Sequence, residues 1–329
     1  MNSLHRMQLR SAHLQRGINL IEIMVSMVIG LFLVLGATTL YINSKKSADV
    51  DDSIARLQET SRYALSILET DIRMANFWGL VKDGSNVTNR LQNINPTSTL
   101  TTGTNADNCG ANYPLDAINP IVATNNSYPF SNTTCAAVNN AQASADTLTV
   151  RRASTTGTAT AGTLQVCATR QSSTIISNGT CASQVFDLMT NIYYVAQGSA
   201  QSATLPSLRR KSLINGPAFQ DQEIIPGIED MQIELGWSND ASNSAAAVQY
   251  LQPGTAVANG QVVAVRLWLL VRAETQDFTY TDTKTYTYAD RAGTATGTLT
   301  AGRPYAPNDN FQRLLVSRTF FIRNAAGTT

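Results

Sequence analysis

The chain has 329 residues, and its 24 Lys and Arg against 23 Asp and Glu give no basic excess of the kind that phosphate binding favours. Both histidines, His5 and His13, lie in the first 17 residues, so the rest of the chain lacks the imidazole that Ser-His-Asp catalysis, Cys-His catalysis and histidine metal sites require. Because no phosphate loop or dinucleotide fingerprint is present either, the sequence predicts no enzyme, no cofactor and no metal site, and its charge balance disfavours a nucleic-acid partner.

Residues 1–17 form a charged leader that contains three arginines and no acid. This composition is typical of a targeting segment rather than of a folded domain. Residues 23–44 contain no Asp, Glu, Lys, Arg or His, and the run is long enough to cross a hydrocarbon core as one helix. In an ordinary secretory signal the small-residue cleavage site follows the apolar core. Here Gly17 precedes the core, so we expect the apolar segment to remain in the mature protein.

The junction between leader and apolar run resembles the N-terminal signature of type IV prepilins. Residues 17–22 read Gly-Ile-Asn-Leu-Ile-Glu. The resemblance implies that a prepilin peptidase cuts between Gly17 and Ile18 and methylates the new amine. Glu22 is then the fifth residue of the mature chain, as the family requires. Most members begin with phenylalanine or methionine, so Ile18 departs from the pattern, which bears on the methylation rather than on the cleavage.

Glu22 is an acid at the edge of an apolar segment. A carboxylate in a bilayer costs about 2.5 to 3.5 kcal/mol at the centre and less toward the interface, so such a residue usually has a partner. After cleavage, the Ile18 ammonium of a neighbouring subunit would supply the opposite charge and set the register in which two helices dock. The alternative is that Glu22 lies at headgroup depth and meets water. That alternative leaves the glycine, the spacing and the uninterrupted apolar run unexplained.

The cysteines indicate on which side of the membrane the head lies. All four follow the apolar run, which suits an oxidising periplasm and two disulfides. The arginines of the leader favour a cytoplasmic N-terminus, which also places the head in the periplasm. Four cysteines allow three connectivities. Sequential pairing of Cys109 with Cys135 and of Cys167 with Cys181 closes the shortest loops, so we expect this connectivity. The other two connectivities remain as alternatives. A four-cysteine metal site is disfavoured because no close Cys-x-x-Cys pair is present.

Residues 45–80 carry the pattern of an amphipathic helix. Charged residues occupy other faces, while apolar residues recur at spacings of three, four or seven: Val50, Ile54, Leu57, Ala64, Leu68, Ile72 and Ala75. One helix is therefore expected from Ile18 to about Asn76. Its first half would lie in lipid or a filament core, and its second half would pack on a globular head.

Residues 57–79 also resemble the corresponding helix of PilW-type minor pilins, and two later stretches, 225–232 and 319–324, agree with that family. Two positions depart from its pattern. Asn76 stands where a glycine is common, and Leu80 stands where a cysteine often follows. The second departure implies that a further disulfide found in some relatives is missing from this chain.

Residues 81–329 predict a β-rich head. The segment from about 83 to 145 is rich in Asn, Thr, Ser and Ala, so we expect exposed loops with short strands there. Beyond it, apolar runs and alternation predict strands at 146–150, 163–166, 192–195, 231–237, 262–271 and 314–322. The expected fold is α+β and pilin-like, with the long N-terminal helix packed on an antiparallel β-sheet head.

The strand at 262–271 has the clearest pattern. Val263, Val265, Leu267, Leu269 and Val271 share one face, while the arginines at 266 and 272 lie on the other. Such alternation predicts a central antiparallel strand with one covered face.

Charged pairs in the head carry two further expectations. The acidic pairs at 51–52 and 229–230 align on no predicted pocket, so a solvated face explains them best. The basic clusters at 151–152 and 209–211 offer some support for DNA binding. However, without the three leader arginines the chain has 21 basic against 23 acidic residues, which argues against it.

Together these features and the resemblance imply a minor pilin of PilW type, a structural subunit that primes or caps a type IV pilus. Its segments would be a leader (1–17), a membrane or filament-core helix (18–44), an amphipathic helix (45–80) and a periplasmic head (81–329). Expected partners are the prepilin peptidase, the major and other minor pilins, the inner-membrane assembly platform and a tip adhesin. The expected location is the inner membrane before assembly and the pilus afterwards, with roles in twitching motility, adhesion and DNA uptake.

Two rival functions share the same sequence features. A minor pseudopilin of a type II secretion system would have the same leader, Glu22 and head. A pilus-tip adhesin or DNA receptor would carry its binding site in residues 83–145.

Overall fold

The computed structural model describes residues 17, 19–81, 84–90, 113–130, 135–214, 218–238, 248–255 and 260–325. The chain divides into two compact units, residues 1–52 and residues 53–329. Of the predicted leader only Gly17 is described, and Ile18 lies outside the described residues. The second unit contains the end of the long helix and all the strands, and we call it the head.

The long N-terminal helix α1 spans Leu20–Met74. It begins after Asn19, whose carbonyl oxygen accepts the first helical hydrogen bonds from the backbone amides of Glu22 (2.9 Å) and Ile23 (3.3 Å). It ends before Asn76, which has a φ of 62° in the left-handed region where helices commonly stop at glycine or asparagine. Asn76 can therefore replace the glycine of the PilW pattern. The side-chain amide of Asn76 also donates to the carbonyl oxygen of Asn324 (2.6 Å).

The last turns of α1 pack on the sheets of the head. The buried positions are Leu57, Ser61, Ala64, Leu65, Leu68, Asp71 and Ile72, and they follow the helical spacing that the sequence indicated. The buried stripe begins at Leu57, because Ile54 is 41% exposed although the pattern included it. The α+β class with a long N-terminal helix is confirmed.

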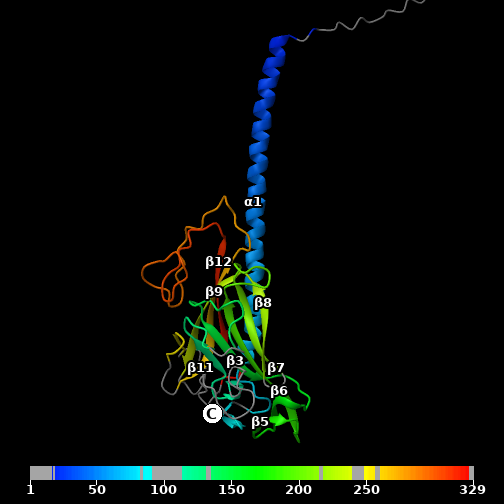
Figure 1. The fold of residues 1–329 in the computed structure, drawn as a ribbon, viewed down its shortest axis with the longest axis vertical. Helices are drawn as coiled ribbons and strands as arrows, with labels where there is room; N and C mark the ends of the chain where they lie inside the picture. Colours follow the sequence, from blue (N-terminus) through cyan, green and yellow to red (C-terminus); the bar gives the residue numbers. More distant parts are fainter. Residues whose placement is uncertain are drawn as a thin grey trace, which may run out of the picture. The chain divides into compact units, whose positions relative to one another are not determined.

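In the described residues, the strands of the head form an eight-stranded and a four-stranded sheet (Figure 1). In the order of the larger sheet the strands are β1 (Val87–Thr88), β5 (Ser173–Asn178), β4 (Ala161–Ala168), β6 (Gln184–Ala196), β3 (Thr147–Ala153) and β2 (Ile121–Thr124). From β6 this sheet also extends through β7 (Ser207–Ile214) to β8 (Ala218–Pro226). The smaller sheet has the order β10 (Gln249–Leu251), β9 (Ile228–Ser238), β11 (Gln261–Arg272) and β12 (Arg313–Phe321).

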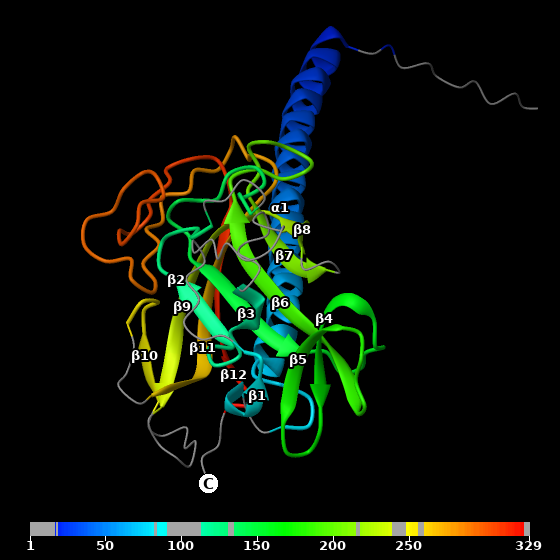
Figure 2. The same ribbon diagram turned by 60° about the horizontal axis from the view of Figure 1, so that its bottom comes forward.

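Strand β6 organises the larger sheet because it pairs with three others. Its first residues, 184–187, pair with β4, and its later residues pair with β3 and β7. Figure 2 shows β4 and β5 at one end of this sheet, with β3 and β7 farther along β6. Every pairing in both sheets is antiparallel except that of β1 with β5, among the described residues. Short 3-10 turns occur at Gly84–Asn86 and Tyr113–Leu115.

One hydrophobic core joins α1 to both sheets. It contains Leu68 and Ile72 from the helix, Tyr193 from β6, Ile233 from β9 and Leu267 from β11, all at most 1% exposed. The inward face of β11 was therefore predicted correctly. Its opposite face was not, because Leu270 is also buried, under three tyrosines of the segment 273–312: Tyr286, Tyr288 and Tyr305.

The segment 83–145 is less exposed than its composition suggested. Among its described residues, Tyr113, Ile121, Phe130 and Cys135 are all at most 4% exposed, and β2 pairs with β3 along its full length. The expectation of exposed loops was wrong for this part, because apolar residues scattered among polar ones still reach the core. Residues 91–112 and 131–134 lie outside the described residues.

Candidate functional site

The start of α1 places Glu22 in the first turn of the helix. A carboxylate there interacts favourably with the helix dipole and with the amides that have no partner inside the helix. The side chain of Glu22 is exposed. The carbonyl oxygen of Glu22 accepts a hydrogen bond from the hydroxyl of Ser26 (2.7 Å). The exposed carboxylate of Glu22 is therefore accessible to a group from another molecule.

The first half of α1 exposes a continuous apolar surface. Each of these side chains is more than half exposed: Leu20, Ile21, Ile23, Met24, Val25, Met27, Val28, Ile29, Leu31, Phe32, Leu33, Val34, Leu35, Leu40, Tyr41 and Ile42. By length and composition this helix could cross a membrane, and none of its most apolar window is buried. Water is a poor solvent for an apolar surface of this extent. The segment is therefore compatible with a surrounding of lipid or of other helices.

Two threonines of this segment bond back to the helix. The hydroxyls of Thr38 and Thr39 donate to the carbonyl oxygens of Val34 (2.7 Å) and Leu35 (2.6 Å), one helical turn earlier. A hydroxyl that bonds back to its own helix needs no water. These two hydroxyls are thus compatible with an apolar environment.

Asp71 fixes the end of α1 to the larger sheet. Its carboxylate oxygens accept hydrogen bonds from Arg152 (2.8 Å to the terminal nitrogen), from the amide of Asn191 and from the hydroxyl of Tyr193 (2.6 Å). The Asp71 and Arg152 side chains are 6% and 11% exposed, so this ion pair is buried. Burial, together with the Asp71 charge, raises the pKa of Tyr193 well above its ordinary value. The sequence analysis missed this contact, because Asp71 reads as one more charge on the outer face of a helix.

The basic cluster at 151–152 does not form a surface patch. Arg151 is fully buried, and its guanidinium donates to the carbonyl oxygens of Tyr113 (2.9 Å) and Asn119 (2.7 Å). Arg152 is occupied by Asp71. Both arginines are therefore already bound within the head.

The cluster at 209–211 is largely paired with the neighbouring strand. Arg209 pairs with Asp221 (2.7 Å) and Glu223 (2.9 Å), and Lys211 pairs with Asp221 (3.1 Å). These acids belong to β8, which the sequence analysis did not predict. The third cation, Arg210, donates to Gln222 (3.0 Å), so the cluster keeps an excess of one positive charge over the two acids. One excess charge is far less than the extended basic surface that nucleic-acid binding favours.

The acidic pair at 229–230 is buried, so the expectation of a solvated face was wrong. Asp230 is fully buried and pairs with Arg291, which is 1% exposed. Glu229 pairs with Nε of the Arg313 guanidinium, and Nη1 of the same guanidinium pairs with Asp309 (2.6 Å). Burial raises the pKa of Asp230 against the lowering effect of Arg291.

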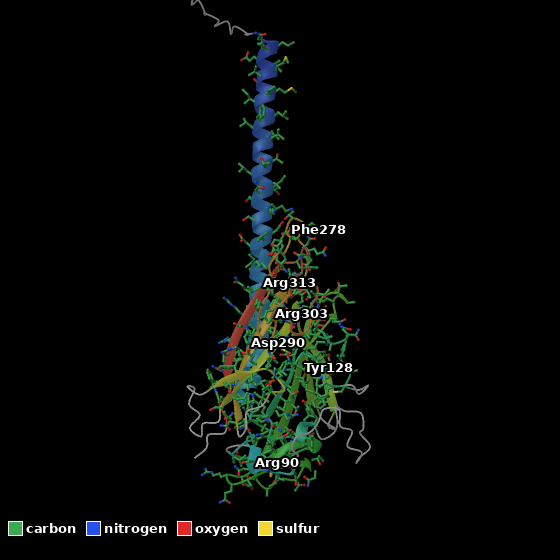
Figure 3. All side chains as sticks on the ribbon, turned by 90° about the vertical axis from the view of Figure 1, so that its left-hand side faces the viewer. Arg90, Tyr128, Phe278, Asp290, Arg303 and Arg313 are labelled. Carbon is green, nitrogen blue, oxygen red and sulfur yellow. A yellow bond between two sulfur atoms is a disulfide. The ribbon has the colours of Figure 1, made fainter. Side chains whose placement is uncertain are left out.

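These two arginines attach a long segment to the smaller sheet. Arg291 lies within the segment 273–312, which contains no described strand, and Arg313, labelled in Figure 3, opens β12. The hydroxyl of Tyr288 also donates to Asp230. No local sequence signal identifies the pairs, because the partners lie 61 and 84 residues apart. The network therefore defines the head's structure without placing a reactive group in an open cavity.

The described cysteines are all disulfide-bonded. Cys167 and Cys181 form a disulfide with their Cα atoms 5.7 Å apart. Cys135 is buried and disulfide-bonded, while Cys109 lies outside the described residues.

Residues 192–324 match the family model of type IV pilus-assembly protein W, PilW. This part of the chain is PilW-like. The match runs from the second half of β6 to just beyond β12. The stretches 225–232 and 319–324 lie inside it, whereas 57–79, the part of the sequence with the closest resemblance to PilW-type minor pilins, lies outside it. The buried pairs of Asp230 and Arg291 and of Glu229 and Arg313 are therefore both features of the PilW-like region.

Among solved structures, a type IV-like pilin from Thermus thermophilus is similar over 82% of this chain and 99% of its own, with 14% identity and a TM-score of 0.36. A TM-score of this size carries no argument about the function of the chain. The search among curated proteins found no match.

Proposed function

We propose that this chain is a minor type IV pilin of PilW type, made as a prepilin and assembled through its N-terminal helix. The observation that carries the proposal is the first half of α1. Its apolar side chains are exposed, its Thr38 and Thr39 hydroxyls bond to its own backbone, and Glu22 is its single carboxylate before residue 49. The PilW match of residues 192–324 supports the same role for the head.

In this mechanism the leader, residues 1–17, is removed after Gly17, and residues 18–44 hold the subunit in the inner membrane. The head lies in the periplasm until assembly moves the subunit into the pilus. The new ammonium of Ile18 in a neighbouring subunit then pairs with Glu22. Breaking a buried pair by removing one partner costs about 3 to 5 kcal/mol. A register error between helices would therefore be strongly disfavoured.

The size of the head supports a place at the tip or in the initiation complex. Residues 53–329 form one compact unit, larger than a slim repeating subunit would be. A bulky head packs poorly in a regular filament, whereas at the end of the filament it meets neighbours on one side only. The partners would be the prepilin peptidase, the assembly platform, the major and other minor pilins and a tip adhesin.

Gene deletion with complementation tests the proposal. Loss of surface pili and twitching that the wild-type chain restores would support it, and Glu22→Leu should fail to restore them at equal protein level. Glu59→Gln is the matched control, because Glu59 is an exposed acid of the same helix. Loss of enzyme secretion instead would indicate a type II pseudopilin. Normal pili without adhesion or DNA uptake would indicate a tip receptor.

A further inference from the structure

A polar cavity opens where the loop before β4 lies against β6. Its volume is about 310 Å³, and its lining residues are Thr156, Gly157, Thr158, Thr160, Thr163 and Asp187. This volume is at the lower end of the range for small-molecule sites. The lining has four hydroxyls and one carboxylate but no aromatic, basic or long apolar side chain, which excludes an apolar or an anionic ligand.

The cavity is built around a buried glutamine. Gln165 on β4 is 0% exposed and lies directly opposite Asp187 on β6. Its side-chain amide donates to Asp187 Oδ1 (2.8 Å) and to the carbonyl oxygen of Thr158 (2.6 Å). Its carbonyl oxygen accepts from the backbone amide of Thr160 (3.0 Å). One buried side chain thus fixes both the carboxylate and the threonine loop.

The loop also lies directly on the strand. A Cβ at Gly157 would come within 2.9 Å of the backbone nitrogen of Asp187, so only glycine allows this approach. Ser154 bonds to Asp187 twice, because its amide donates to the Asp187 carbonyl oxygen (2.8 Å) and its hydroxyl accepts from the Asp187 amide (2.8 Å). The disulfide of Cys167 and Cys181 lies where β4 ends and shortly before β6 begins, and Cys167 is the Cα partner of Val185. The site is therefore held in place before any ligand arrives, which lowers the entropy cost of binding.

We propose that this cavity binds a neutral saccharide unit through Asp187. A carboxylate with one oxygen held by Gln165 offers its second oxygen to ligand hydroxyls, and a threonine hydroxyl can both donate to and accept from a sugar. No ion pair to Asp187 occurs among the described residues, so its charge is free to act on the ligand. A calcium ion fits less well, because it prefers six to eight oxygen ligands and more than one carboxylate.

The function of such a site would be to hold the assembled subunit on a sugar-coated surface. A small polar site of this kind binds one monosaccharide with a dissociation constant on the order of 1 mM, and repeated sugar units met by the tips of several pili would raise the avidity. This role is additional to the proposed assembly function, and it uses residues that α1 does not contain.

The test is a titration of the full chain in lipid nanodiscs, followed by NMR of labelled threonine methyl groups. The probes are D-glucose, D-galactose, D-mannose and N-acetyl-D-glucosamine at up to 50 mM, and calcium chloride alone. We expect at least one sugar to shift the methyl signals of Thr156, Thr158, Thr160 or Thr163. Asp187→Asn should weaken that binding at least tenfold, and Thr158→Val should weaken it about threefold. Thr155→Val is the control that should change nothing, because Thr155 is exposed and does not line the cavity.

Three results would overturn the proposal. One is the absence of any sugar-dependent shift, another is an equal affinity in Asp187→Asn, and the third is a response to calcium alone. The threonine spectrum without ligand shows directly whether each variant is folded. Cells that carry Asp187→Asn should still make normal numbers of pili, so a failure of this site is distinguishable from a failure of the assembly mechanism.

Discussion

Replacing Asp71 by asparagine should destabilise the head strongly. The carboxylate compensates the buried Arg152 charge and accepts hydrogen bonds from Asn191 and Tyr193. Asparagine keeps the shape but offers one acceptor oxygen, and its NH2 group would face donors. Removing one partner of a buried ion pair costs about 3 to 5 kcal/mol. With a denaturant dependence of about 4 to 6 kcal/mol per M in guanidinium chloride, the midpoint should fall by about 0.5 to 1.3 M.

The assay is equilibrium unfolding of the full chain in detergent micelles, followed by tryptophan fluorescence. Trp78 is a suitable probe, since it is fully buried just after α1 and its indole donates to Asn76 (2.9 Å). Glu59→Gln on the same helix should change the unfolding free energy by less than about 0.5 kcal/mol. The pair Asp71→Leu with Arg152→Met should lose less than Asp71→Leu alone. A loss below about 1 kcal/mol in Asp71→Asn would show that the buried pair of Asp71 and Arg152 contributes little to the stability of the head.

Three further predictions concern the head. Burial raises the pKa of Asp146 from 3.8 to about 8, so the folded state holds an extra proton between these pH values and the free energy of unfolding falls as pH rises through them. Asp146→Asn should remove from this pH dependence a slope of about 1.4 kcal/mol per pH unit between pH 5 and 7, and an unchanged slope in urea titrations would contradict this. Arg291→Met leaves Asp230 buried without a counter-charge and should lower the free energy of unfolding by about 3 to 5 kcal/mol in the same assay. Adding Asp230→Asn should restore part of this loss, whereas full stability of Arg291→Met alone would contradict the prediction. Replacing Cys167 and Cys181 by serine opens a loop with a sequence separation of 14 and should cost about 3 kcal/mol, and an unchanged melting temperature would contradict that estimate.

Periodic segments were predictable from the sequence because their pattern reflects which face is buried. The alternation of β11 and the stripe of α1 from Leu57 onward both appear in the structure with the expected inward faces. Hydrophobic burial acts on each residue separately, so one segment contains enough information to orient itself.

Contacts between charged residues were not predictable in this way. The sequence of strand β7, which contains Arg209 and Lys211, suggests a basic surface. In the structure, Asp221 on the neighbouring strand β8 pairs with both of these cations. Similarly, the pair of Asp230 and Arg291 depends on the path of the chain between them. A buried charge is acceptable only with its partner, and the partner is fixed by the fold rather than by the local sequence.

The polar cavity illustrates a third kind of information. Gln165, Gly157 and Asp187 carry no recognisable motif, and they meet only because β4 and β6 pair in one particular register. A register shift of one residue would turn Asp187 to the other face of the sheet. Only the structure therefore indicates this site.

Cleavage after Gly17 is tested most directly by the mass of the N-terminal peptide from membranes of cells with and without the prepilin peptidase. If the chain is a prepilin, the peptide begins at methylated Ile18 only when the peptidase is present. A chain that retains its leader, or one that is cut beyond the apolar run, would contradict the prepilin assignment. The docking role of Glu22 would then have no basis, because its partner is the amine that this cleavage creates.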